Sequence, residues 1–332
     1  MAPRAQMAVA AVVASAVAVA VAIVVRTDTT GETGSGLGES FGYDLSALRR
    51  TDPALVKYAE SARLQTGLRE ALAIAVDGAD RVYVAGDTAV RALVREGEAT
   101  REIALGAPPR ALAVGPDGKV YVAMRDHVEV HDPAGVASPS VWASLGAGAV
   151  ITSIALSADG VFVADAGNRV VLRFDVSGQL LNRIGQRDEA AGVEGFVVPS
   201  PYFDVAAGGD GFVFAANPGR HRIETYSYDG CFASSWGTAS TGIEGFCGCC
   251  NPSHFAITPS GGFVTAEKGL PRVKEYAPDG AFVGVVAGPE VFAEGTVGLD
   301  LAVDSTGRVL VMDPVSREVR VFERTTPGGG AK

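Results

Sequence analysis

The sequence predicts an all-β protein, a six-bladed β-propeller, from three observations. Six segments repeat one pattern, in which an apolar–Ala–apolar stretch is followed by a turn and an alternating apolar strand. Their anchoring alanines lie 38, 42, 51, 50 and 46 residues apart, close to the length of a four-stranded blade. Glycine makes up 42 of 332 residues, as a chain with many tight turns requires. The alanines are Ala75, Ala113, Ala155, Ala206, Ala256 and Ala302.

Composition excludes several other classes of protein. The net charge of −10 argues against a phosphate-binding surface, so we expect no nucleic-acid partner. Four cysteines are too few for a disulfide-built mini-domain. The mixture of 47% hydrophobic and 20% charged residues excludes a disordered chain, a coiled coil and a polytopic membrane protein. We expect a monomeric globular body.

Residues 1–26 are predicted to be a tail and a transmembrane signal-anchor. Met7 to Val25 contains 19 apolar or small residues between Arg4 and Arg26, just enough to cross a bilayer. The alternative is a cleaved signal peptide, for which Ala14-Ser15-Ala16 offers a small-x-small site. Under either interpretation, the rest of the chain after residue 26 is exported across the membrane. We expect a single-pass protein of the inner (cytoplasmic) membrane, with its body on the extracytoplasmic or periplasmic side.

The chain then divides into a linker, the propeller and a tail. Residues 27–45 are polar and glycine-rich, typical of a flexible linker. The propeller is assigned to 46–325, and 326–332 is expected to be a disordered tail. Thr51-Asp52-Pro53 resembles a helix start, which predicts a short helix from Pro53 to Arg63.

Each repeat also contains a second strand pair. In the third repeat, Val170 to Asp175 is followed by a Ser-Gly turn and then by Leu180 to Ile184. The last repeat ends after its third strand, near Val319 to Glu323. A closed ring needs a fourth strand there, and Ala59 to Thr66 is the nearest candidate.

The repeats resemble those of the NHL-repeat family of six-bladed propellers. ADAGNRVVLRFDVSGQLLNRIG, at 164–185, is similar to a full NHL repeat, and the fourth and fifth repeats are close variants. The resemblance covers roughly Gly67 to Glu323. It implies the fold but not one activity, because the family includes binding modules as well as lyases and hydrolases. For Asp165, Asn168 and Arg169 it implies a structural role.

The four strands of each repeat are called A to D in chain order. Candidate site residues lie in the loops between strands B and C and in the connections from strand D to strand A of the next repeat. A propeller directs both kinds of loop to the mouth of its channel. The segments before the fourth and fifth repeats depart most from the repeat pattern. We expect their polar side chains to converge into a pocket for a polar ligand. The alternative is that the same side chains form salt bridges with one another and fill the top of the channel. The candidates are Tyr202, Asp204, Asn217, Arg220, His221, Asn251, Glu267, Lys268 and Arg272.

Three of the cysteines form a C-x-C-C motif, and its chemistry has three possible interpretations. Cys247, Cys249 and Cys250 form one disulfide plus a thiol, or bind zinc or copper with His254 as a fourth ligand, or are inert or catalytic thiols. Cys231 follows a turn on the opposite face, a strand length away, so it should not pair with them.

These observations predict a binding or scaffold module for a protein partner or a small polar ligand. The alternative is a metal-dependent lyase or hydrolase that uses the Cys/His cluster. No P-loop or H-E-x-x-H motif occurs, and the G-x-S-x-G match at 38–42 lies in the glycine-rich linker and not at a strand-to-helix turn, so no catalytic residue is assigned. A spacer that holds a complex together is a third possibility.

Overall fold

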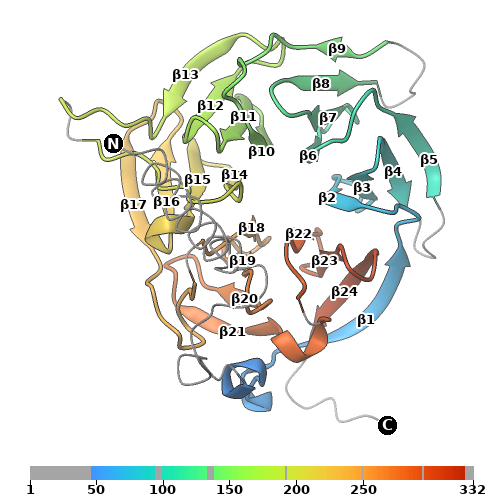
Figure 1. Cartoon of the computed structure of the whole chain (residues 1–332), viewed down its shortest axis with the longest axis vertical. Coiled ribbons are helices and arrows are strands. Elements are labelled where there is room, and N and C mark those ends of the chain that lie inside the picture. The colour runs from blue at the N-terminus through green and yellow to red at the C-terminus, as the bar shows by residue number, and fades with distance from the viewer. Residues whose placement is uncertain are drawn as a thin grey trace, which may run out of the picture. The chain divides into compact units, whose positions relative to one another are not determined.

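Six four-stranded antiparallel sheets are arranged as blades around a central channel (Figure 1). The computed structural model describes residues 46–93, 99–132, 138–190, 193–248, 250–293 and 295–325. The proposed anchor, the linker up to residue 45, Cys249 and the tail 326–332 lie outside these residues. No helix among the described residues has the length and hydropathy to cross a bilayer.

The strands of each blade follow the chain from the channel outward, in the order A, B, C and D. Blade 1 contains β2 (Ala71–Val76), β3 (Val82–Gly86), β4 (Ala89–Leu93) and β5 (Ala99–Ala104). Blade 2 contains β6 (Ala111–Val114), β7 (Val120–Ala123), β8 (Val128–His131) and β9 (Ser140–Val141). Blade 3 contains β10 (Ile151–Ser157), β11 (Gly160–Asp165), β12 (Val170–Phe174) and β13 (Leu180–Ile184).

The remaining blades follow the same plan. Blade 4 contains β14 (Val205–Ala207), β15 (Phe212–Asn217), β16 (Arg222–Ser227) and β17 (Phe232–Trp236). Blade 5 contains β18 (His254–Ile257), β19 (Phe263–Ala266), β20 (Val273–Tyr276) and β21 (Phe282–Ala287). Blade 6 contains β22 (Asp300–Val303), β23 (Val309–Asp313), β24 (Glu318–Arg324) and β1 (Tyr58–Gln65). Short 3-10 turns are η2 (Ser46–Arg49), η3 (Pro53–Leu55), η4 (Pro218–Arg220) and η5 (Pro289–Val291).

Blade 6 closes the ring with a strand from the start of the propeller. β1 pairs antiparallel with β24, from Tyr58 opposite Arg324 to Gln65 opposite Glu318 (Figure 1). The predicted closure by 59–66 is therefore confirmed. The predicted helix from Pro53 to Arg63 is wrong. Only Pro53–Leu55 forms a helical turn, capped by Asp52, because the following residues pair with blade 6 and its backbone hydrogen bonds outweigh a short helix.

The hydrophobic core consists of layers between neighbouring blades. Six clusters occur among the described residues, each drawing side chains from two adjacent blades. Middle strands are covered on both faces, and β11 and β23 are accordingly buried throughout and apolar except for the aspartate that ends each of them. Outer strands alternate or are exposed, as β13 and β17 are.

C–D turns from one blade pack against the outer strand of the preceding blade. A Cβ atom on Gly280, at φ +83°, would lie 2.5 Å from Trp236 of blade 4. Gly178, at φ +90°, abuts Trp142 of blade 2 at 2.6 Å in the same way. Both positions require glycine, for the backbone conformation and for the close approach.

Gly280→Ala should lower the free energy of unfolding by about 2 kcal/mol or more, because the clash with Trp236 adds to the strain of a positive φ. Gly307→Ala is the matched control: its φ is +82° and its Cβ would meet nothing within 4 Å. Urea denaturation of both variants measures the difference. Equal losses would contradict a role for the Trp236 contact.

Candidate functional site

The narrow part of the central channel contains one polar layer of side chains. The layer comes from a single repeat position, two residues before each anchoring alanine. Around the ring this position is occupied by Ala73, Ala111, Ser153, Asp204, His254 and Asp300. Ser153 and the last three residues line a chamber of about 100 Å³. Four of the six ring positions are therefore polar, and the two alanines are apolar.

His254 lies between the two buried carboxylates. Its Nδ1 is 3.4 Å from Asp300 Oδ1 and 3.8 Å from Asp204 Oδ2. Burial raises the pKa of both carboxyl groups, while His254 opposes the increase. The nearby Asp204 raises the pKa of Asp300 further.

The two carboxylates also tie neighbouring blades together. Asp204 of blade 4 accepts a hydrogen bond from the Phe255 amide of blade 5 at 2.7 Å. Asp300 of blade 6 accepts one from the Ile74 amide of blade 1 at 2.9 Å. These bonds satisfy amides that face the channel, so both residues have a structural function whatever the channel binds.

A cavity of about 430 Å³ opens above this chamber, and every blade contributes to its wall. Thr152 and His254 line both spaces, so the cavity and the chamber are contiguous. Tyr202 meets His254 edge-to-face, with ring centroids 6.0 Å apart. The lining residues are Ala71, Leu72, Pro108, Pro109, Arg110, Thr152, Pro201, Tyr202, His254, Val297, Gly298 and Pro314. We call this space the mouth cavity.

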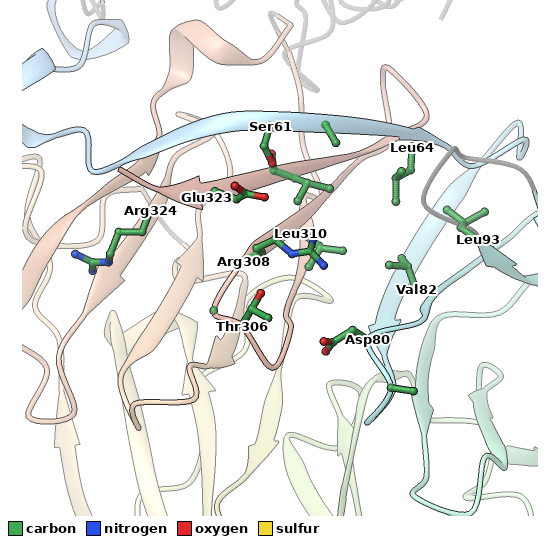
Figure 2. Close-up of a pocket in the computed structure, with 14 residues that line it drawn as sticks. Ser61, Leu64, Asp80, Val82, Leu93, Thr306, Arg308, Leu310, Glu323 and Arg324 are labelled. Carbon is green, nitrogen blue, oxygen red and sulfur yellow. The ribbon is translucent and has the colours of Figure 1, made fainter. Parts of the chain in front are cut away.

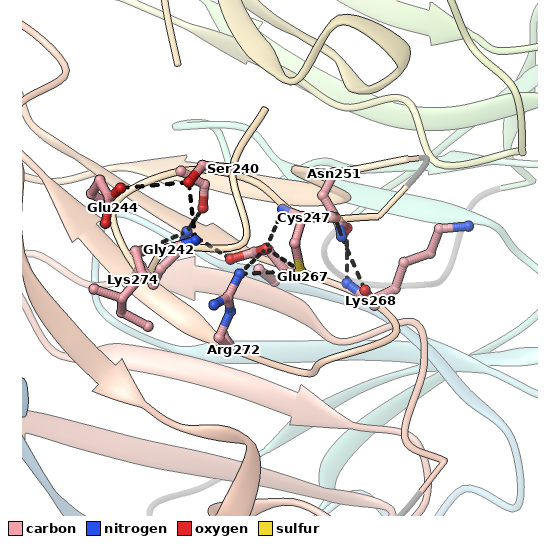
Figure 3. Close-up of polar contacts among 12 residues, drawn as sticks. Ser240, Gly242, Glu244, Cys247, Asn251, Glu267, Lys268, Arg272 and Lys274 are labelled. Atoms are coloured by element: carbon pink, nitrogen blue, oxygen red, sulfur yellow. Dashed lines mark hydrogen bonds and ion pairs between the residues drawn. The ribbon is translucent and has the colours of Figure 1, made fainter. Parts of the chain in front are cut away.

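Blade 5 contains a buried charged cluster beside the mouth (Figure 3). Glu267 lies 2.7 Å from both Arg272 and Lys274, and all three side chains are almost fully buried. Lys274 also donates to the backbone carbonyls of Ile243 and Gly245. The cluster therefore fixes the connection between β17 and β18 against the blade.

Burial lowers the pKa of Lys274 to about 8, although Glu267 opposes the change. Desolvation outweighs the ion pair because the ammonium group is completely removed from water. Phe246 and Tyr276 cover it at 4.7 and 5.4 Å from their ring centroids. Burial raises the pKa of the Tyr276 hydroxyl, so this tyrosine stays protonated through the same range.

The structure divides the predicted site residues among several places. Tyr202, Asp204 and His254 meet at the channel. Lys268 approaches from blade 5, with Nζ 4.7 Å from the Tyr202 ring and 3.0 Å from Ser200. Asn251 bonds the backbone of Cys247 and Lys268, which fastens two loops together.

The other candidates do not reach the channel. Asn217 is buried and bonds Glu224 and the Val197 amide. Arg220 pairs with Glu194 and lines a separate cavity. His221 occupies the left-handed turn after η4. Glu267 and Arg272 belong to the buried cluster. The expected single pocket that includes Arg220 and Glu267 is therefore not formed, because Arg220 pairs with Glu194 while Glu267 pairs with Arg272 and Lys274.

The described cysteines show no common site. Cys247 accepts from Arg272 at 3.2 Å, and burial and Glu267 raise the pKa of its thiol. Cys250 is buried, and Cys231 is exposed in the turn between β16 and β17. Within the described ranges no three His, Cys, Asp or Glu side chains are placed to hold a metal. His254 faces carboxylates in the channel and not Cys247.

A larger cavity than the mouth cavity lies between blades 6 and 1 (Figure 2). Its volume is about 1090 Å³, and apolar side chains such as Leu64 and Leu310 form much of the lining. Several of its polar groups already have partners: Asp80 bonds Ser305, and Arg308 pairs with Asp304. No group of unsatisfied polar atoms converges there, so the mouth cavity is the better candidate.

Two important residues were missed by the sequence analysis. Asp300 was overlooked although it aligns with Asp204 and His254 in the repeat, and this alignment was the available signal. Lys274 resembles any polar residue of an alternating strand, VKEY, and nothing local indicates that it is buried. The structural role expected for Asp165 is seen: its carboxylate accepts from the Val150 and Asn168 amides.

Lys274→Met should change how stability depends on pH. Between pH 7 and 9.5 the native lysine loses its proton while the unfolded lysine, with an ordinary value of 10.5, keeps it. The wild-type protein should therefore gain about 2 kcal/mol over this range relative to the variant. Urea denaturation at both pH values measures the gain. Lys268→Met, at a partly exposed lysine, should retain the wild-type slope; an unchanged slope in Lys274→Met would contradict the burial argument.

Comparisons with known proteins show the fold alone. No family model and no curated protein matches the chain, so the NHL resemblance stays a prediction. A streptogramin B lyase structure is similar, with TM-score 0.57 and 10% identity over 82% of this chain and 100% of that one. A protein of unknown function from Bacteroides thetaiotaomicron gives 0.57 and 16% identity, over 80% and 71%. The WD40 β-propeller domain of Doa1 gives 0.54 and 14%, over 77% and 80%. The chain is therefore a six-bladed β-propeller.

Proposed function

We propose that this protein is a membrane-tethered, extracytoplasmic binding module whose ligand occupies the mouth cavity. The observation that carries the proposal is that all six blades line one cavity of about 430 Å³. Small-molecule sites are concave spaces of this size, with mostly apolar walls and a few polar groups. The NHL resemblance supports a binding role without naming a ligand.

The chemistry of the wall defines the kind of ligand. Leu72, Val297 and several prolines form an apolar collar, and Thr152 and His254 form a polar floor. Arg110 stands exposed at the rim. The matching ligand is a small molecule with an apolar body and one hydrogen-bonding head that reaches the floor. A protein partner that inserts one side chain into the collar is the second form of the same proposal.

The proposal of a membrane tether rests on the apolar stretch from Met7 to Val25, which is long enough to span a bilayer. Residues 27–45 would link it to the propeller. The location at the inner membrane, with the propeller on the extracytoplasmic side, follows from the same stretch. Membrane flotation of the full chain, with and without carbonate extraction, tests this part of the proposal.

The alternative is a metal-dependent lyase or hydrolase built on Cys247, Cys249, Cys250 and His254. Its support is the C-x-C-C motif, whose soft ligands suit zinc or copper. Against it, Cys247 is engaged by Arg272, and His254 lies between two carboxylates. Binding at the mouth cavity therefore agrees better with the described contacts.

Val297→Trp should weaken ligand binding by about ten-fold or more, because the indole would fill the mouth cavity. The probe is the amphipathic dye 1-anilinonaphthalene-8-sulfonate, followed by fluorescence titration. Val176→Trp, at an exposed valine of a C–D turn, is the matched control and should bind like the wild type. Equal affinity in the two variants would place the binding site elsewhere.

Metal analysis of the purified full chain, with a thiol count before and after reduction, distinguishes the proposed binding module from the alternative metal-dependent enzyme. We expect no stoichiometric zinc or copper. Metal that is present in the wild type and lost in the double variant Cys249→Ser, Cys250→Ser would favour the enzyme.

A further inference from the structure

The two faces of the propeller differ in charge. The A–B and C–D turns form one face, here called the hairpin face, and besides Asp132 their described residues include nine aspartates. Turn chemistry explains them, because Asp77, Asp175 and Asp304 each accept hydrogen bonds from amides of their own turn. The set is Asp77, Asp80, Asp117, Asp159, Asp175, Asp210, Asp229, Asp279 and Asp304.

Few basic groups compensate this charge. Arg81, Lys119 and Arg308 pair with aspartates of their own turns, and Arg173 lies 3.8 Å from Asp229. The carboxylates of the other five aspartates have no lysine or arginine partner within the described ranges: Asp80, Asp159, Asp175, Asp210 and Asp279. The hairpin face is therefore strongly acidic.

The B–C loops and D–A connections form the opposite face, here called the mouth face, which contains exposed arginines. Four of them have no carboxylate partner among the residues described: Arg110, Arg125, Arg169 and Arg317. Most carboxylates there already contact a basic group, as Asp87, Asp126, Glu189 and Glu194 do. Glu70, Asp165, Glu244 and Glu290 have none in the described part and balance the four arginines, so this face is close to neutral overall.

The chain passes beside the mouth face before it reaches β1, which itself begins at Tyr58, at the hairpin end of blade 6. Thr51 Oγ1 donates to Glu290 Oε2 at 3.2 Å. Glu290 lies in η5, on the connection from β21 to β22, and D–A connections belong to the mouth face. The 19 residues from 27 to 45 give a flexible linker a mean reach of only about 25 Å. A membrane anchor before that linker would hold this face near the bilayer.

Exposed apolar side chains lie among the arginines. Leu72, Val297 and Val315 are 41%, 51% and 51% exposed around the mouth. Phe212 and Phe232 are also exposed, but they flank turns that contain Asp210 and Asp229. Apolar groups beside arginines suit an anionic lipid surface, whereas apolar groups beside carboxylates do not.

We propose that the mouth face docks onto an anionic phospholipid surface, with the acidic hairpin face directed away from it. The inference rests on the membrane anchor of the proposed function and adds the orientation of the propeller. Anionic lipid repels the hairpin face and attracts the unpaired arginines, so both faces favour the same orientation. The occupant of the mouth cavity would then enter from the lipid–water interface.

Photo-crosslinking of the full chain in vesicles tests the orientation. The photoreactive residue p-benzoylphenylalanine replaces Val315 on the mouth face or Val176 on the hairpin face, both exposed valines. In a three-to-one mixture of phosphatidylcholine and phosphatidylglycerol, lipid adducts at position 315 should exceed those at 176 by about ten-fold. High salt, or phosphatidylcholine alone, should reduce the excess.

Two arginines of blade 3 provide a matched pair. Arg169→Gln removes an unpaired charge from the mouth face and should lower labelling at position 315 by up to about five-fold. Arg183→Gln removes an exposed charge from the outer strand β13 and should change nothing. Circular dichroism and thermal unfolding of both variants verify the fold.

The outcomes separate the two proposals. A chain that does not float with the vesicles refutes the membrane anchor, and the orientation with it. A chain that floats but is labelled at position 176 as much as at 315 refutes the orientation alone. Equal effects of Arg169→Gln and Arg183→Gln would show that the mouth-face charge does not direct docking, and would also overturn the inference.

Discussion

Burial of each sheet between two neighbours is the constraint on which this structure depends. A single blade exposes two apolar faces, so it is stable only when both faces are covered. A ring covers every face, provided that its first and last blades meet. Pairing of β1 with β24 brings them together, since Leu64 of β1 packs with Leu310 and Val84 across the junction. The channel and the mouth cavity exist because this ring is closed.

The polar layer of the channel shows how one repeat position can serve structure and binding together. Asp204 and Asp300 satisfy amides of the next blade, which accounts for their burial. With His254 between them and Ser153 in the same layer, they make four of the six ring positions polar, and Ala73 and Ala111 leave the other two apolar. The buried Glu267 cluster has a complementary effect, because it holds the connection that precedes His254.

The fold could be predicted from the sequence because repeat spacing and turn chemistry are local signals. Closure of the ring by β1 could also be predicted from the sequence, because the last repeat contains only three strands and a closed ring requires a fourth. The helix expected at Pro53 failed because its capping signal competes with long-range pairing, which a local pattern does not contain. The site was predicted only in part: the face of each loop follows from topology, but the direction of Arg220 within its loop depends on Glu194, far along the chain.

Closure by an N-terminal strand has a mechanical consequence. A pull on the N-terminus passes the side-chain bond of Thr51 to Glu290, then reaches Lys57, whose amide bonds Val285 of blade 5, and then Tyr58. Tyr58 is the end of β1 that pairs with Arg324, so tension would peel the strand away one pair at a time from this end towards Gln65. The seam that completes the propeller is thus also the place where tension would open it. An anchored chain under load would lose its closing strand while the other five sheets keep all four of theirs.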